Sequence, residues 1–255
     1  MEPRLVPSLF VLLLPSLLLS LFALVSSGFE LSLLHTNDVH ARVEETSEVS
    51  GACSRSKGKH CFGGVARRAT AVKRLRVAEP NVLLLDAGDQ FQGSVWFSFY
   101  KGAEAAHFMN KLSYDAMAFG NHEFDNGVSG LMKPFLEQVR CPVLSANIRV
   151  DPPLDSTFGT AFRPYVVLRV GEEQVGVVGY TSRETPALSD QVLLSDSGPL
   201  LHFEDELSAL QRQIIALGHS GFTLDQEVAR RVRGVDVVIG GHSNTFLYTA
   251  WFLFL

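Results

Sequence analysis

Aspartate, asparagine and histidine recur in short clusters along the chain, and each cluster follows a run of apolar residues. The five clusters occupy residues 35–40, 86–89, 120–125, 218–221 and 240–244, and glycines flank four of them. Carboxylate and amide oxygens together with imidazole nitrogens, without thiolates, are typical ligands of zinc, manganese or another first-row divalent ion. The clusters therefore indicate a metal site and not an iron–sulfur centre.

The repetition of the pattern carries this inference, since a single Asp-x-His pair is usually a turn residue beside a surface histidine. In open α/β sheets, ligands bind at the carboxyl ends of the strands. Because every cluster follows a predicted strand, we expect all five to converge on one rim. The flanking glycines allow the sharp backbone turns that this convergence requires.

Six side chains are the candidate metal ligands: Asp38, His40, Asp89, Asn121, His219 and His242. One ion needs about four ligands, and a carboxylate can bridge, so six side chains can hold two ions. Asp89 is the middle ligand in sequence order and the predicted bridge. Two ions about 3.5–4 Å apart can contact the attacking and leaving oxygens of a phosphoryl displacement. The sequence therefore predicts a dinuclear hydrolytic centre.

His122 and Asp125 lie three residues apart, directly after the candidate ligand Asn121. The Asp125 carboxylate can orient the His122 imidazole and keep it cationic. Such a cation would stabilise phosphoryl oxygens or protonate a leaving alcohol. The alternatives are that His122 is a further metal ligand or a helix-cap residue.

The elements that must position these clusters are short strands alternating with helices. The apolar runs are 31–34, 82–85, 116–119, 143–146, 175–178, 214–217 and 235–239. Most of them lack alternation, which is typical of strands buried on both faces. Amphipathic stretches at 65–78, 103–112 and 225–233 are predicted helices. This alternation predicts an α/β fold with a largely parallel or mixed sheet.

Composition narrows the class of protein. The chain has 255 residues, of which 46% are apolar and 19% charged, which excludes a disordered chain. The net charge of -5 argues against a nucleic-acid partner, because no excess of cations is available to neutralise phosphates. Three cysteines are too few for a disulfide-stapled scaffold. Cys53 and Cys61 can form a local bridge, and Cys141 is predicted to be a buried free thiol.

The N-terminus has the pattern of a targeting segment. Arg4 precedes an almost entirely apolar stretch over 5–25, and small residues follow at 26–28. This pattern predicts a cleaved signal peptide over 1–28 and a secretory route. A membrane-spanning anchor is the alternative, since the stretch approaches the roughly 20 residues that a span needs.

The C-terminus is an aberrant apolar tail over 250–255. It is too short to span a bilayer and lacks the spacer of a lipid-anchor signal. We therefore expect no stable membrane anchor in this chain.

The clusters resemble motifs of the 5′-nucleotidase family of calcineurin-like metallophosphatases. The resemblance rests on His35-Thr36-Asn37-Asp38-Val39-His40, Asp86-Ala87-Gly88-Asp89-Gln90, Gly120-Asn121-His122-Glu123-Phe124-Asp125, Gly218-His219-Ser220 and Gly241-His242-Ser243-Asn244. The similarity covers about residues 30–249. It implies a four-layer α/β metallophosphoesterase sandwich over 29–249, with the metal site at the carboxyl ends of the strands.

The resemblance also implies roles for individual residues. Asp38 and His40 would bind one zinc ion, and Asp89 would bridge both ions. The second zinc would be held by Asn121, His219 and His242. His122 and Asp125 match the catalytic dyad, and Asn244 falls where a residue near the substrate phosphate is expected.

The implied reaction is hydrolysis of nucleoside 5′-monophosphates, chiefly AMP, to nucleoside and phosphate at the cell surface. Three departures from the family pattern are expected: the nucleoside-binding C-terminal domain is missing, the lipid-anchor signal that it would carry is missing, and the segment near 207–214 is shortened, which affects the placement of His219. The alternative is therefore a truncated, non-catalytic form, either one that folds poorly or one that pairs with the full-length enzyme. A phosphodiesterase or protein phosphatase on the same metal scaffold is a third interpretation.

Overall fold

The computed structural model describes residues 29–53, 60–152, 154–189, 194–195, 198–199, 201–203 and 215–247. The chain divides into Met1–Glu30 and Leu31–Leu255, and the elements below belong to the second unit. The predicted signal peptide up to residue 28, the shortened segment near 207–214 and the tail over 250–255 lie outside the described residues. Among the residues described, no helix has both the length and the apolar character needed to cross a bilayer.

The first sheet contains four parallel strands in sequence order. These are β1 (Ser32–Thr36), β2 (Val82–Asp86), β3 (Ala116–Ala118) and β4 (Val143–Leu144). All three pairs of neighbours run parallel. A parallel sheet is covered on both faces, and β3 is accordingly buried along its whole length.

The second sheet has the order β12 (Val237–Ile239), β11 (Ile215–His219), β7 (Glu173–Thr181) and β6 (Tyr165–Val170). The strands β12, β11 and β7 are parallel, whereas β6 pairs with β7 as an antiparallel hairpin. The strands that precede the polar clusters therefore belong to two sheets, and the expected single rim is a junction between two sheet edges.

The two sheets pack face to face, with β3 and β4 against β7 and β11. The core between them is formed by Leu83, Leu85, Ala116, Ala118 and Leu144 of the first sheet and Val175, Val177, Ile215, Leu217 and Ile239 of the second. Burial on both faces explains why the sequence runs of these strands lack alternation.

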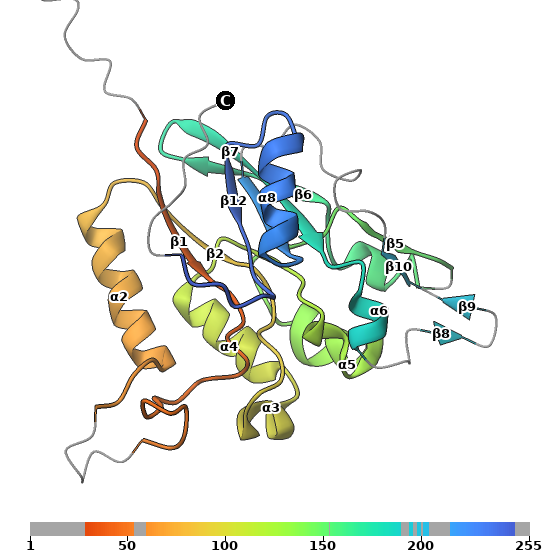
Figure 1. Cartoon of the computed structure of the whole chain (residues 1–255), viewed down its shortest axis with the longest axis horizontal. Coiled ribbons are helices and arrows are strands. Elements are labelled where there is room, and N and C mark those ends of the chain that lie inside the picture. The colour runs from red at the N-terminus through yellow and green to blue at the C-terminus, as the bar shows by residue number, and fades with distance from the viewer. Residues whose placement is uncertain are drawn as a thin grey trace, which may run out of the picture. The chain divides into compact units, whose positions relative to one another are not determined.

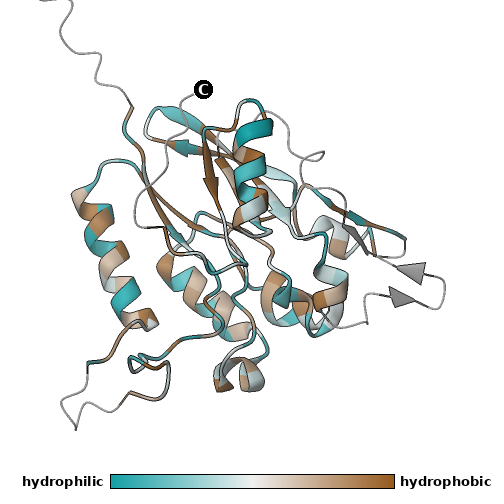
Figure 2. Ribbon diagram, viewed as in Figure 1, coloured by the Kyte–Doolittle hydropathy of each residue, from teal (hydrophilic) through white to brown (hydrophobic). Residues whose placement is uncertain are grey.

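Helices cover the outer faces (Figure 1). On the first sheet lie α2 (Val65–Ala78), α3 (Val95–Tyr100), α4 (Ala103–Leu112) and α5 (Gly127–Leu131), and α8 (Phe222–Arg231) lies on the second. Figure 2 shows apolar residues along β12 and a mixture of hydrophilic and apolar residues along α2 and α8. The resulting order of helix, sheet, sheet, helix is the four-layer architecture that the resemblance implied.

Smaller elements connect these layers. They are the helix α6 (Thr185–Leu188), the strand pairs β5 (Ile148–Val150) with β10 (Leu201–Phe203) and β8 (Leu194–Ser195) with β9 (Gly198–Pro199), the 3₁₀ turns His122–Phe124 and Phe158–Thr160, and the π turn Met132–Leu136. The predicted helices over 65–78 and 103–112 have the predicted bounds. Helix α8 begins at Phe222, three residues before the predicted start.

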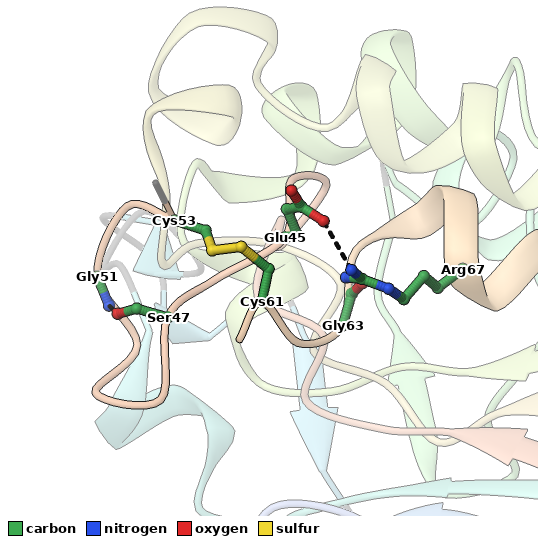
Figure 3. The surroundings of a disulfide bond; sticks show 7 residues. All are labelled: Glu45, Ser47, Gly51, Cys53, Cys61, Gly63 and Arg67. Atoms are coloured by element: carbon green, nitrogen blue, oxygen red, sulfur yellow. Dashed lines mark hydrogen bonds and ion pairs between the residues drawn. A yellow bond between two sulfur atoms is a disulfide. The ribbon is translucent and has the colours of Figure 1, made fainter. Parts of the chain in front are cut away.

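A disulfide closes the loop before α2. Cys53 and Cys61 are bonded, with their Cα atoms 5.7 Å apart, which confirms the local bridge. Figure 3 shows that Glu45, beside this bridge, forms a 2.9 Å ion pair with Arg67 at the start of α2. Cys141 is a free thiol, but it is half-buried at the edge of the core and not fully buried as predicted.

The C-terminal end of α2 is joined to α4 by Arg76. Its guanidinium donates to the carbonyl oxygens of Leu112 and Ser113 at 2.7 and 2.6 Å and pairs with Asp115 at 3.2 Å. A cation on the last carbonyls of a helix is favourable because it satisfies acceptors that the helix leaves unpaired. Arg67 and Arg76 of α2 thus both have partners within the fold.

The disulfide is expected to stabilise the fold without supporting the polar clusters. The two cysteines are eight residues apart, and a loop of this length predicts a loss of up to about 2.5 kcal/mol in the double variant Cys53→Ser/Cys61→Ser. Urea unfolding with and without reductant measures this loss. The reductant should destabilise the wild type and leave the double variant unchanged. Equal sensitivity of both proteins would contradict the assignment.

Candidate metal centre

The loops that follow β1 and β2 run side by side beyond the ends of the strands. The amides of Asp38 and His40 donate to the carbonyl oxygens of Gly88 and Asp89 at 2.9 and 3.0 Å. These bonds lie beyond the last paired residues of β1 and β2 and place Asp38 and His40 next to Asp89. The local backbone therefore assembles the first three predicted ligands.

Asp38, His40 and Asp89 offer ligand atoms that all lie within 4.8 Å of one another. The His40 Nε2 atom is 3.9 Å from Asp38 Oδ1 and 3.8 Å from Asp89 Oδ2. These separations are too long for hydrogen bonds. Two atoms that each lie about 2.0–2.2 Å from one ion can be up to about 4.4 Å apart, so the group has dimensions suited to a shared cation.

The second sheet supplies the remaining histidines. His219 at the end of β11 is fully buried, and its Nε2 atom lies 3.0 Å from Asp89 Oδ2 and 3.9 Å from Asp38 Oδ1. The rings of His219 and His242 are 5.1 Å apart. The His242 amide donates to Asp38 Oδ2 at 3.0 Å. Both histidines therefore join the group formed by the first sheet.

Two predicted ligands carry buried polar atoms without a hydrogen-bond partner among the described residues, namely Asn121 Oδ1 and His219 Nε2. His219 Nε2 is close to the Asp89 carboxylate but is not aligned for a hydrogen bond with it. An unsatisfied buried polar atom costs about 1–3 kcal/mol. A divalent cation would satisfy both atoms, so the residues present at this site fit a metal ion.

The Nδ1 atoms of His219 and His40 form hydrogen bonds that fix the tautomer required for metal binding through Nε2. The Nδ1 atom of His219 donates to the Ala87 carbonyl at 2.6 Å, and that of His40 donates to the Phe91 carbonyl at 3.0 Å. Both interactions keep a proton on Nδ1, so Nε2 is the nitrogen that presents a lone pair to a metal once the imidazole is neutral. Such a second hydrogen bond is typical of metal-binding histidines.

The charges at the centre act strongly on one another. Burial lowers the pKa of His219, but the carboxylates of Asp89 and Asp38 outweigh it and raise the pKa to about 9. Burial raises the pKa of Asp89, yet the neighbouring His219 and His122 bring it below its ordinary value. A cation entering the site would therefore meet an ionised Asp89 and would displace a proton from His219.

The predicted dyad is also assembled. His122 Nδ1 donates to Asp125 Oδ2 at 2.7 Å, and this bond raises the pKa of the His122 imidazole, against the opposing effect of partial burial. The His122 ring lies 5.4 Å from the His40 ring, and its amide donates to Asp89 Oδ1 at 2.9 Å. His122 is thus held at the edge of the centre with its Nδ1 atom occupied by a carboxylate.

Comparison with known proteins agrees with this geometry. A profile of the calcineurin-like phosphoesterases matches residues 31–246. The chain belongs to this family. The phosphoesterase fold and its dependence on divalent metal ions follow from this membership.

Individual relatives are more specific in name. The chain is 57% identical to 5′-nucleotidase of Homo sapiens over 92% of its length, and 55% identical to snake venom 5′-nucleotidase of Naja atra over 87%. It spans 42% of the length of each of these relatives. Among solved structures, a 5′-nucleotidase precursor from Thermus thermophilus matches with a TM-score of 0.73 and 38% identity, covering 87% of this chain and 43% of that chain.

The phosphoesterase centre is built on unusual backbone conformations. Positive φ angles occur at Asp38 (48°), His40 (50°), Asp89 (60°), His242 (74°) and Asn244 (50°). The left-handed region is uncommon for residues other than glycine, and residues held there cluster at functional sites. All five are residues that the sequence analysis assigned to the site.

Two glycines permit the close approach of these loops. A Cβ atom on Gly120 would lie 2.2 Å from Asp89 Oδ1, and one on Gly241 would lie 2.7 Å from His219 Nδ1. Any larger residue at either position would displace a predicted ligand. The glycines that flank the clusters thus have a steric role in addition to their role in turning the chain.

Asn244, the predicted substrate-binding residue, is exposed. Its Nδ2 atom is 3.5 Å from the carbonyl oxygen of His242. It shares the loop after β12 with His242, which puts it near the centre. Its predicted role at the substrate phosphate stays a prediction.

Two buried carboxylates beside the centre were given no role by the sequence analysis. Asp86 ends β2 and accepts hydrogen bonds from Thr36, Gln90 and the Gly88 amide, and Glu123 lies in the turn after Asn121. Both are fully buried. The position of these acids in the sequence could have identified them. An acid at the end of a fully apolar strand, or between two site residues, must have partners when it is buried.

The predicted bridging role of Asp89 can be tested directly. Asp89→Ala removes the carboxylate that faces both His40 and His219, so we expect the variant to lose both ions. Atomic absorption after removal of free metal measures the content per chain. Glu172→Ala, which removes a carboxylate that is 93% exposed, serves as the control. Two ions per chain in the Asp89 variant would show that another residue forms the bridge.

Proposed function

We propose that this chain is a dinuclear metal-dependent phosphomonoester hydrolase that converts nucleoside 5′-monophosphates, with AMP as the main substrate, to nucleoside and phosphate. The observation that carries the proposal is the placement of one oxygen atom. Asp89 Oδ2 lies 3.8 Å from His40 Nε2 and 3.0 Å from His219 Nε2. The other oxygen, Oδ1, accepts the His122 amide. Oδ2 is therefore the natural point at which two cation sites would meet.

The ligands divide between two cation sites around this atom. Asp38, His40 and Asp89 would hold one ion, and Asp89, Asn121, His219 and His242 would hold the other. Zinc suits these sites because it accepts imidazole nitrogen and carboxylate oxygen in low coordination numbers. When bound, the pair of ions supplies electrophilic stabilisation of phosphoryl oxygens and a source of nucleophilic oxygen near neutral pH.

The chain's own residues would then orient the phosphate and move a proton. Asp125 holds the His122 imidazole through Nδ1 and favours its cationic form, which leaves Nε2–H to donate to a phosphoryl oxygen or to the leaving oxygen. Asn244 would contact the same phosphate from the loop after β12. Charge developing on the phosphoryl group would thus face a fixed donor that needs no reorganisation.

The nucleoside preference and the location of the protein are supported by different observations. The names of the human, cobra and Thermus proteins support a nucleoside monophosphate as substrate. Passage through the secretory pathway to the cell surface or extracellular space is supported by the disulfide, because such bonds persist in oxidising compartments. The venom origin in the name of the cobra relative supports the same route.

A three-substrate assay tests the reaction class. The zinc-loaded chain should release phosphate from AMP and from p-nitrophenyl phosphate, and it should leave bis-p-nitrophenyl phosphate intact. Colorimetric phosphate and nitrophenolate measurements report the rates, and Asp89→Ala provides the background. Preferential cleavage of the diester would identify a phosphodiesterase instead, and activity on none of the three would favour a non-catalytic role.

The role of His122 can be separated from metal binding. His122→Ala should keep its metal and lose about 10²–10⁴-fold in kcat, the usual contribution of a general acid. Because Asp125 raises the pKa of His122, the wild type should be active while the imidazole is protonated and should lose activity as the pH rises through that pKa. The variant should lack this basic limb.

Metal content and the pH profile together decide the assignment of His122. Loss of metal in the alanine variant would make His122 a ligand. An unchanged basic limb would move the titration to another group.

A further inference from the structure

Glu123 is a fully buried acid at the back of the metal centre. Its two carboxylate oxygens accept four backbone N–H groups. The Oε2 atom accepts from Asp89 at 2.9 Å and Gly120 at 2.6 Å, and Oε1 accepts from Gln90 at 2.8 Å and Phe91 at 3.2 Å. The three bonds from Asp89, Gln90 and Phe91 join the loop after β2 to the loop after β3, and the bond from Gly120 lies within the latter loop.

The same four bonds exclude Glu123 as a metal ligand. A carboxylate has about four acceptor positions, and four backbone amides occupy them here. Both oxygens of Glu123 are therefore directed at the backbone and not at a cation.

The bonds act where the chain most needs support. Asp89 has a φ angle of 60°, in the left-handed region that few residues other than glycine adopt. Its amide is held by Glu123, and its Oδ1 atom is held by the amide of the adjacent His122. The residues at 120–123 thus fix both the backbone and the side chain of the predicted bridging ligand.

We propose that Glu123 is the positioning residue of the metal centre, and that its buried carboxylate holds the 89–91 backbone so that Asp89 Oδ2 faces both cation sites before any ion binds. The proposal rests on the metal-binding part of the proposed function and does not depend on the substrate. It assigns a role to the acid of the 120–125 cluster that the sequence analysis left without one.

Glu123→Gln is the sharpest substitution. It conserves shape but replaces one acceptor oxygen with an NH₂ group that must face two backbone N–H donors. We expect the variant to bind cobalt(II) about 10–100-fold more weakly, the range for loss of a residue that orients metal ligands. Its visible cobalt spectrum at saturation should also differ from that of the wild type, because the Asp89 geometry has changed.

Glu104→Gln is the matched control. Glu104 is also buried, and its Oε2 atom accepts the Gly102 amide at 2.9 Å at the start of α4. The control makes the same chemical change at a buried carboxylate of α4 that accepts no amide of the 89–91 loop, and it should leave the affinity and the spectrum unchanged. A folded Glu123→Gln protein with wild-type affinity and spectrum would overturn the proposal.

A measurement on the wild type keeps the test decisive if the variant does not fold. Hydrogen exchange at the amides of Asp89, Gln90 and Phe91 should already be slow without zinc, because Glu123 binds them before any ion is present. Protection that arises only on adding zinc would show that the ion organises the loop and would overturn the proposal. If the chain binds metal and its loop amides are protected without zinc but it has no phosphatase activity, the proposed function fails and the role of Glu123 stands.

Discussion

The concentration of buried negative charge at Asp89 is the constraint on which the rest of the site depends. Asp38, Asp89 and Glu123 lie close together out of solvent, where ionised carboxylates are costly unless they are paired. Backbone amides satisfy Glu123, and one amide satisfies Asp89 Oδ1. What remains is directed to a single place, where Asp89 Oδ2 and Asp38 Oδ1 face the histidines. Unpaired negative charge is thereby concentrated at the position that suits cations, whereas the other carboxylate oxygens accept backbone amides.

The sequence predicts those parts of the fold that follow from burial alone. The seven apolar runs all correspond to strands, because strands covered on both faces must be continuously apolar. The same property conceals how the strands are distributed, since the runs at 82–85 and 215–217 look alike but belong to different sheets. The apolar run at 165–168, which forms most of β6, was not among the predicted strands, and α3 has only six residues, too few to show a helical repeat.

The candidate site was predictable in its ligands and less so in its supports. Asp38, His40, Asp89, His219 and His242 are chemically conspicuous, and convergence at strand ends brings them together. Glu123 interacts with amides, which carry no side-chain identity, so no residue type elsewhere in the sequence points to it. The left-handed conformations at Asp38, His40 and Asp89 were hidden for a related reason, because local preference disfavours them and tertiary contacts impose them.

The division of the predicted ligands between two sheets has a mechanical consequence. The loops of the first sheet carry Asp38, His40, Asp89 and Asn121, whereas His219 and His242 come from the second. The spacing between the ligands of the two sheets therefore depends on how the sheets pack across the layer of Leu85, Ala118, Leu144 and Leu217. Close-packed interiors transmit strain with little compression. The apolar layer consequently acts as a spacer of fixed thickness, and a change of one methyl group within it is expected to alter the distance between predicted ligands that the methyl group does not contact.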